Sequence, residues 1–151
     1  MKTKTYHRRS IRLNGYDYTQ NGNYFLTICT RNRECLFGDV RDGKMYLSNY
    51  GGLVNECWQE ISAHFPQIVL HEYVIMPNHI HLLVVLNDSS YTISNIVRFI
   101  KTQTTKQIGY SIFQRSFHDH IIRDATEYEK IWNYIEDNPR KWNEDKYYLA
   151  L

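Results

Sequence analysis

The sequence predicts an α+β domain of the ferredoxin-like (RRM-like) class, with an antiparallel central sheet and helices on one side. The chain has 151 residues, the size of one typical domain. Short runs rich in aromatic and β-branched residues alternate with segments of helical spacing. These segments follow the order strand, helix, two strands, helix, short strand, helix, which is a split β-α-β arrangement with an added C-terminal helix. We therefore expect residues 1–151 to form a single domain.

The first half of the chain is expected to hold one strand, a hairpin and one helix. Aromatic and β-branched residues at Tyr24–Thr30 follow an Asn-Gly-Asn turn and predict the strand. Asp42-Gly43 lies between the short extended pieces of Val40–Leu47, which is typical of a hairpin. Apolar residues recur at helical spacing over Leu53–Ile61, after two glycines and before a proline, so a helix is expected there.

The second half is expected to hold three strands and two helices. Ile68–Ile75 predicts one strand, and His79–Leu86 predicts another that is apolar on both faces, as in the centre of a sheet. Isoleucine and valine recur at helical spacing over Ile93–Ile100. A short strand is expected at Phe117–Ile122, and the last helix over Ala125–Asp137.

Charge is distributed unevenly along the chain. The net charge is +2, yet residues 1–12 carry five basic side chains and no acidic one. A basic arm over residues 1–15 on a near-neutral body suits a protein that meets phosphate groups, although a solvated tail has the same composition. No apolar run approaches the roughly 18 residues needed to span a bilayer, and the three cysteines show no C-x-x-C spacing. We expect a cytoplasmic protein without membrane partners.

Two histidines stand out on the strand that is expected to be central. His79 and His81 are two residues apart, so both side chains project from one face of the strand. Two imidazoles on one face suit a divalent cation and leave coordination positions open. Two structural histidines are the simpler alternative. A second pair, His118 and His120, lies in a polar stretch where histidine needs no special explanation.

The last helix offers two polar side chains on one flank. Asp124 is expected to cap this helix, with Glu127 in the capping-box position. The residues that form its apolar stripe are Tyr128, Ile131, Trp132 and Ile135. Tyr134 falls outside this stripe, and Asn138 lies one turn further on the same flank. If that flank faces His79, Asn138 supplies a third metal ligand and Tyr134 reaches a metal-bound phosphate. A boundary tyrosine with its hydroxyl in water is the alternative.

The sequence resembles the single-tyrosine HUH transposases, and in particular the REP-associated tyrosine transposases of bacteria. The resemblance is most specific in two blocks about fifty residues apart, Met76–Leu83 (MPNHIHLL) and Tyr134–Pro139 (YIEDNP). Further matching positions run through nearly the whole chain: Arg8-Arg9-Ser10, Gly15-Tyr16-Asp17-Tyr18, Tyr24–Thr30, Trp58, His64-Phe65-Pro66, Ile100-Lys101 and His120–Arg123.

The resemblance implies an HUH fold, a ferredoxin-like sheet with a C-terminal helix that carries the tyrosine. It implies that Tyr134 is the nucleophile, and that His79, His81 and Asn138 hold Mg²⁺ or Mn²⁺. The expected reaction is cleavage and rejoining of single-stranded or hairpin DNA through a 5′-phosphotyrosine, by a monomer or a homodimer. The chain departs from some members by ending soon after Trp142, without a long C-terminal extension.

Six cationic residues are the expected DNA contacts: Arg8, Arg9, Arg12, Arg98, Lys101 and Arg123. No residue stands out as a general base, and Glu127 is a candidate because it shares the flank of Tyr134. Two other functions remain open at this point. An RRM-like module would bind single-stranded nucleic acid without catalysis, and a metallonuclease would use water in place of the tyrosine.

Overall fold

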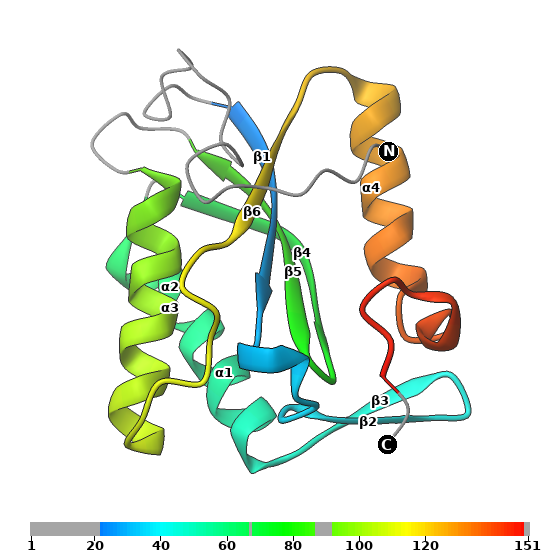
Figure 1. The fold of residues 1–151 in the computed structure, drawn as a ribbon. Coiled ribbons are helices and arrows are strands. Elements are labelled where there is room, and N and C mark those ends of the chain that lie inside the picture. The colour runs from blue at the N-terminus through cyan, green and yellow to red at the C-terminus, as the bar shows by residue number, and fades with distance from the viewer. Residues whose placement is uncertain (1–21, 67, 87–91, 150–151) are drawn as a thin grey trace.

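A computed structural model describes residues 22–66, 68–86 and 92–149 (Figure 1). The basic arm, with its predicted contacts Arg8, Arg9 and Arg12, lies outside these residues. The elements, in chain order, are β1 (Gly22–Cys29), the 3-10 turn η1 (Arg31–Arg33), β2 (Gly38–Arg41), β3 (Lys44–Leu47), α1 (Asn49–Gln59), α2 (Ile61–His64), β4 (Ile68–Met76), β5 (His79–Leu86), α3 (Ile93–Ile108), β6 (His118–Ile122), α4 (Ala125–Asp137) and the 3-10 turn η2 (Trp142–Glu144).

The main sheet has the strand order β4-β5-β1-β6, and each neighbouring pair is antiparallel. This confirms the predicted α+β class and the central position of β5. The register places His81 opposite Thr27 on β1, and Thr27 opposite His118 on β6. The predicted hairpin is also present as β2 and β3, with Asp42 and Gly43 both at positive φ in its turn.

The two faces of the sheet are covered by different helices. Figure 1 shows α1, α2 and α3 on one side of the sheet and α4 on the other. Alternation along β5 sends Ile80 and Leu82 into the larger core with α1–α3, and Leu83 into a smaller core with α4. His79 and His81 alternate in phase with Leu83 and therefore belong to the α4 face. None of the described helices combines the length and apolar character that crossing a bilayer requires.

Helix α1 begins four residues before its predicted start. Ser48 caps it by accepting a hydrogen bond from the Gly51 N–H (3.1 Å), so the two glycines lie inside the first turn. A Cβ on Gly51 would lie 2.2 Å from the Phe37 carbonyl oxygen. Gly51 is therefore needed for the close approach of α1 to the chain before β2.

Helix α4 has the predicted bounds and the predicted apolar stripe, which packs against Leu83 and Ile122. Asp124 caps it by accepting from the Glu127 N–H (2.8 Å). The reciprocal half of the capping box is different from the prediction. The Glu127 carboxylate accepts from the Arg123 N–H (3.0 Å) and contacts His120 Nε2 (2.5 Å). These bonds join the first turn of α4 to β6 and so fix the helix over the sheet.

Candidate active site

His79 and His81 lie side by side and buried on β5, with ring centroids 4.6 Å apart. The Nδ1–H of His79 donates to Asn78 Oδ1 (2.9 Å), and His81 Nδ1 is 3.0 Å from Thr27 Oγ1. The Nε2 atoms of both rings are buried without a hydrogen-bond partner. A partner on Nδ1 leaves Nε2 as the ligand nitrogen, which is the usual arrangement of a metal-binding histidine.

Burial keeps both imidazoles neutral. Desolvation lowers the pKa of His79 to about 4, although the nearby Asp145 carboxylate opposes this shift. Desolvation also holds the pKa of His81 well below its usual value, and His79 adds to the effect. Neutral imidazole is the form that binds a metal ion, so the pair is in its ligand state at neutral pH.

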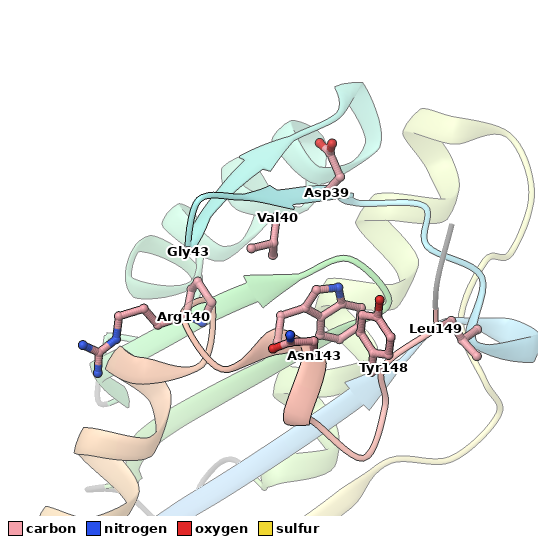
Figure 2. Close-up of a pocket in the computed structure, with 9 residues that line it drawn as sticks. Asp39, Val40, Gly43, Arg140, Asn143, Tyr148 and Leu149 are labelled. Carbon is pink, nitrogen blue, oxygen red and sulfur yellow. The ribbon is translucent and has the colours of Figure 1, made fainter.

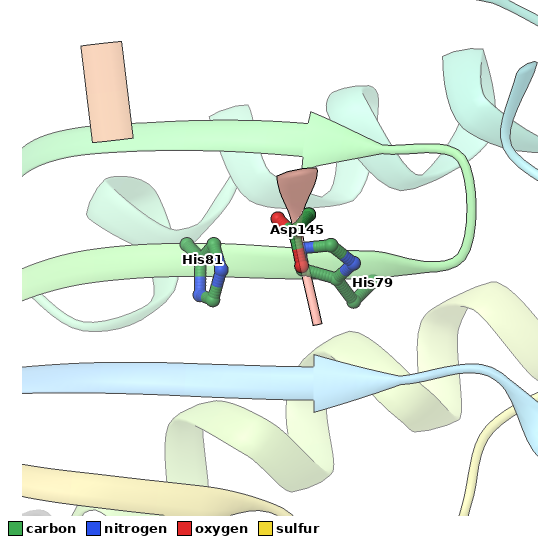
Figure 3. A group of neighbouring side chains, drawn as sticks. All are labelled: His79, His81 and Asp145. Carbon is green, nitrogen blue, oxygen red and sulfur yellow. The ribbon is translucent and has the colours of Figure 1, made fainter. Parts of the chain in front are cut away.

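A carboxylate absent from the sequence-based prediction completes this cluster. Asp145 lies in the C-terminal segment, residues 142–149. One of its carboxylate oxygens and one ring nitrogen from each of the two histidines all lie within 4.8 Å of one another (Figure 3). Asp145 Oδ2 is 3.8 Å from His79 Nε2. It accepts from Asn138 Nδ2 (2.9 Å), and Oδ1 accepts from the Tyr147 N–H (2.8 Å). The bond from Asn138 holds the C-terminal segment against the end of α4, and the bond from Tyr147 orients the Asp145 carboxylate within that segment.

Asn138 ends α4 and is buried, with 3% of its surface exposed. Its Nδ2 is used by Asp145, whereas its Oδ1 has no hydrogen-bond partner. The Asn138 side chain also raises the pKa of His79 and lowers that of Tyr134. Three predicted ligands thus present buried atoms without partners, and such atoms are rare in folded proteins. Two imidazole nitrogens, an amide oxygen and a carboxylate oxygen fit a divalent cation.

Tyr134 lies next to this cluster. Its ring centroid is 5.3 Å from that of His81 and 6.1 Å from that of Phe25, which in turn stacks on His81 at 5.0 Å. The Tyr134 side chain remains 42% exposed, as expected for a residue outside the apolar stripe. Partial burial raises the pKa of the Tyr134 phenol to about 12, Asp145 adds to this rise, and Asn138 opposes it. The metal-free site therefore holds the phenol protonated.

Tyr147 and two cations form the rim of the site. The Tyr147 ring is buried and packs on His79, with centroids 4.5 Å apart. The Arg33 guanidinium and the Lys146 ammonium each lie 5.3 Å from the centroid of this ring. Asn78 Nδ2 donates to the carbonyls of Tyr147 (2.7 Å) and Arg33 (3.2 Å). One amide beside His79 thus joins β5, η1 and the C-terminal segment.

The sequence indicated none of these rim and tail residues. Arg33 lies in an irregular turn, with φ +56°, and Asp145, Lys146 and Tyr147 follow the last regular helix. One sequence feature could have indicated these residues: the short tail directly after the helix with Tyr134 and Asn138 contains a carboxylate and aromatic residues.

The described cations that were predicted to contact DNA do not gather at the site. Arg98 and Lys101 lie on α3, across the sheet from α4. The Lys101 ammonium donates to the carbonyls of Gln114 (2.7 Å), Arg115 (3.3 Å) and Ser116 (3.4 Å), and burial lowers its pKa to about 8. To reach a phosphate, Lys101 would have to release these carbonyls. Arg123 is exposed before α4, and the helix from Ala125 to Tyr134 spans about 14 Å along its axis.

Two other polar residues have structural partners. Glu127 uses both carboxylate oxygens to cap α4 and to bind His120. Because it is committed there, Glu127 is poorly placed as a general base for Tyr134. His120 is likewise bound at the start of α4, while His118 lies opposite Thr27 on the site face of the sheet.

The family model described as Transposase IS200 like matches residues 18–138. An uncharacterised protein of Haemophilus influenzae is 37% identical over 170 residues, a match that covers 95% of this chain and 94% of that protein. A REP-associated tyrosine transposase of Escherichia coli is 26% identical over 125 residues, covering 82% of this chain and 70% of that protein.

A solved structure carries the same fold. It is a REP-associated tyrosine transposase bound to a REP hairpin, with a TM-score of 0.70 and 26% sequence identity, covering 86% of this chain and 73% of that one. The family match spans the histidine pair, α4 and Asn138, that is, every element that forms the cluster except the C-terminal segment. The chain therefore belongs to the IS200-like transposase family of DNA-processing enzymes, and it is similar to the REP-associated tyrosine transposases.

Proposed function

We propose that this protein cleaves and rejoins single-stranded DNA through Tyr134, with Mg²⁺ or Mn²⁺ bound by His79, His81 and Asn138. The observation that carries this proposal is the group of three buried ligand atoms without partners beside the Tyr134 ring. A bound cation would satisfy all three atoms at once. Asp145 adds a carboxylate to the same place, which favours a hard divalent cation.

The proposed reaction follows from where Tyr134 is held. When bound, the cation would polarise a non-bridging oxygen of the scissile phosphate and stabilise the charge that develops there. The apolar stripe of α4 packs on the sheet, and Tyr134 lies outside this stripe, beside His81 and 42% exposed, which supports its role as the nucleophile. The phenol oxygen bonds to phosphorus, the bond from phosphorus to the 3′ oxygen breaks, and the 5′-phosphate remains on the tyrosine. The phenol proton passes to solvent, and the leaving oxygen becomes a 3′-hydroxyl. Attack by a 3′-hydroxyl reverses these steps, so joining needs no ATP.

We propose hairpin DNA as the substrate, because the similar protein of known structure is bound to a REP hairpin. Arg33 and Lys146 flank Tyr147 at the rim of the site and are suited to phosphates next to the scissile one. The contacts predicted for the basic arm, Arg98, Lys101 and Arg123 stay predictions. They would meet DNA outside the cluster.

The test is formation of a covalent adduct. The protein is incubated with single-stranded hairpin DNA and Mn²⁺, and an adduct that resists SDS is measured by gel. An adduct is expected on hairpin DNA and not on blunt duplex. Cleavage without an adduct would identify a metallonuclease, and binding without cleavage would identify an RRM-like module. The nearness of Tyr134 to His81 favours the adduct, since neither alternative uses a tyrosine there.

A further inference from the structure

A cavity lies beside the proposed active site. Its volume is about 400 Å³, and it opens between the β2–β3 hairpin and the C-terminal segment. Trp142 and Tyr148 line one side, and Val40 lines the other. Figure 2 shows Val40 pointing from the hairpin toward Tyr148 and the Asn143 amide across the opening. The cavity is thus a slot with an aromatic side, an aliphatic side and an amide at its edge.

The slot is connected to the active site through one ring. Trp142 has its ring centroid 6.1 Å from that of His79 and 5.2 Å from that of Tyr148. Pro139, which also lines the slot, directly follows Asn138. A DNA strand with its scissile phosphate at the cluster would therefore bring a flanking nucleotide to this opening.

The chemistry of the slot suits a flat heterocycle. Tyr148 lines the slot and is 39% exposed, and the Asn143 amide both donates and accepts hydrogen bonds, as a base edge requires. Arg140 lines the slot with its side chain and keeps its guanidinium outside, paired with Asp137 at 2.7 Å. This exposed pair exchanges at little cost, so Arg140 is free to meet a phosphate at the rim. Unpaired bases are commonly held between aromatic and apolar side chains in this way.

We propose that this slot binds one unpaired DNA base that flanks the cleaved phosphate, with Tyr148 as the stacking residue. The inference rests on the proposed function for its substrate, single-stranded DNA. It adds a specificity site that lies outside the metal cluster.

The experiment is a double-mutant cycle between protein and DNA. Affinity for a hairpin with single-stranded flanks is measured without metal, so that no cleavage occurs, while each unpaired base in turn is replaced by an abasic site. Tyr148→Ala is expected to weaken binding of the intact DNA by roughly 5- to 150-fold, the range of one base–aromatic stack. At one flanking position the abasic site should weaken wild-type binding but not that of Tyr148→Ala. Tyr148→Phe should bind as the wild type does.

Controls separate the loss of a stack from a disturbed fold. Tyr110→Ala removes a ring that is 54% exposed and does not line the slot, and it should leave binding unchanged. Tyr148→Ala should bind Mn²⁺ in the absence of DNA with wild-type affinity. If the substitution instead loosened the C-terminal segment, the affinity for Mn²⁺ would fall. The proposal that the slot binds a base would be overturned if Tyr148→Ala bound DNA as tightly as the wild type. It would also be overturned if every abasic site had the same effect in both proteins. A wild-type protein that couples Tyr148 to one base yet forms no adduct would refute the proposed reaction and leave the slot standing. A protein that binds no single-stranded DNA would overturn both.

Discussion

Asp145 provides a sharp test of how the C-terminal segment contributes to the metal cluster. The change is Asp145→Asn, which keeps the shape of a side chain that is 1% exposed and removes its charge. Asparagine has one acceptor oxygen, whereas Asp145 accepts from both Asn138 Nδ2 and the Tyr147 N–H. One of these donors is left without an acceptor and the other keeps a neutral one, so the metal-free variant should lose about 1.5–3 kcal/mol of unfolding free energy.

Asp145→Asn should also lower the affinity for the metal ion. Removing a residue that ligates or supports a metal ion lowers affinity by about 10–100-fold. At a Mn²⁺ concentration 100 times the wild-type Kd, binding stabilises the wild type by about 2.7 kcal/mol. The variant would gain about 0.4–1.4 kcal/mol at the same concentration. For a chain of this length, 1 kcal/mol moves Tm by about 2–4 °C, so the wild type should gain about 5–11 °C and the variant clearly less.

The assay is thermal unfolding over a Mn²⁺ titration, with Glu144→Gln as the matched control. Glu144 is the exposed acid next to Asp145 in the same segment, and its removal should leave the Mn²⁺-dependent gain in Tm unchanged. An Asp145→Asn protein with the full wild-type gain would refute the reasoning, because the carboxylate would then have no part in the metal site.

Three further outcomes are expected. Replacing His79 or His81 with alanine should abolish Mn²⁺-dependent cleavage. Because both rings are buried, either substitution should also lower Tm. Unchanged cleavage would show that these histidines are not part of the site. Replacing Arg33 or Lys146 with alanine should weaken single-strand binding and leave the Mn²⁺ affinity unchanged. The slope of log affinity against log salt concentration should fall by about 0.7 for each phosphate that is no longer neutralised, and an unchanged slope would show that these residues do not contact the DNA. Hydrogen bonds from a backbone N–H and an imidazole lower the pKa of Glu127 below 4.5. The stability that Glu127 contributes is therefore present above that pH and is lost as pH falls through its folded pKa. Glu127→Gln should flatten this part of the curve of unfolding free energy against pH, measured by denaturant unfolding, and an equal slope in both proteins would contradict the assignment.

The parts of the fold that could be predicted from sequence are those set by local patterns. The apolar run of His79–Leu86 and the capped, striped segment Ala125–Asp137 define their own ends, and both elements have the predicted bounds. The start of α1 was placed too late because glycine was interpreted as a break. In the structure Gly51 serves a close contact with Phe37, which only the tertiary arrangement shows.

The residues of the site also fall into those that local patterns predict and those that only the tertiary structure shows. His79 and His81 share a strand face and Asn138 follows a regular helix, so periodicity could bring them together. Asp145 comes from a tail without periodicity, and its place depends on bonds that Asn138 and Tyr147 make after the chain has closed. Helical spacing likewise could not show that the Lys101 ammonium binds a carbonyl of the loop after α3, and the contact of Lys101 with DNA stays a prediction.

The most direct test of the central claim is to locate the DNA on the protein. Wild-type protein and Tyr134→Phe are incubated with hairpin DNA and Mn²⁺, and the adduct is digested and mapped by mass spectrometry. Tyr134→Phe removes one oxygen from a side chain that is 42% exposed, so its stability should change by less than about 1 kcal/mol and its DNA binding should persist. We predict a 5′-phosphate on Tyr134 in the wild type, and neither adduct nor cleavage in the variant. Cleavage by Tyr134→Phe, or an adduct on Tyr128 or Tyr147, would contradict the account.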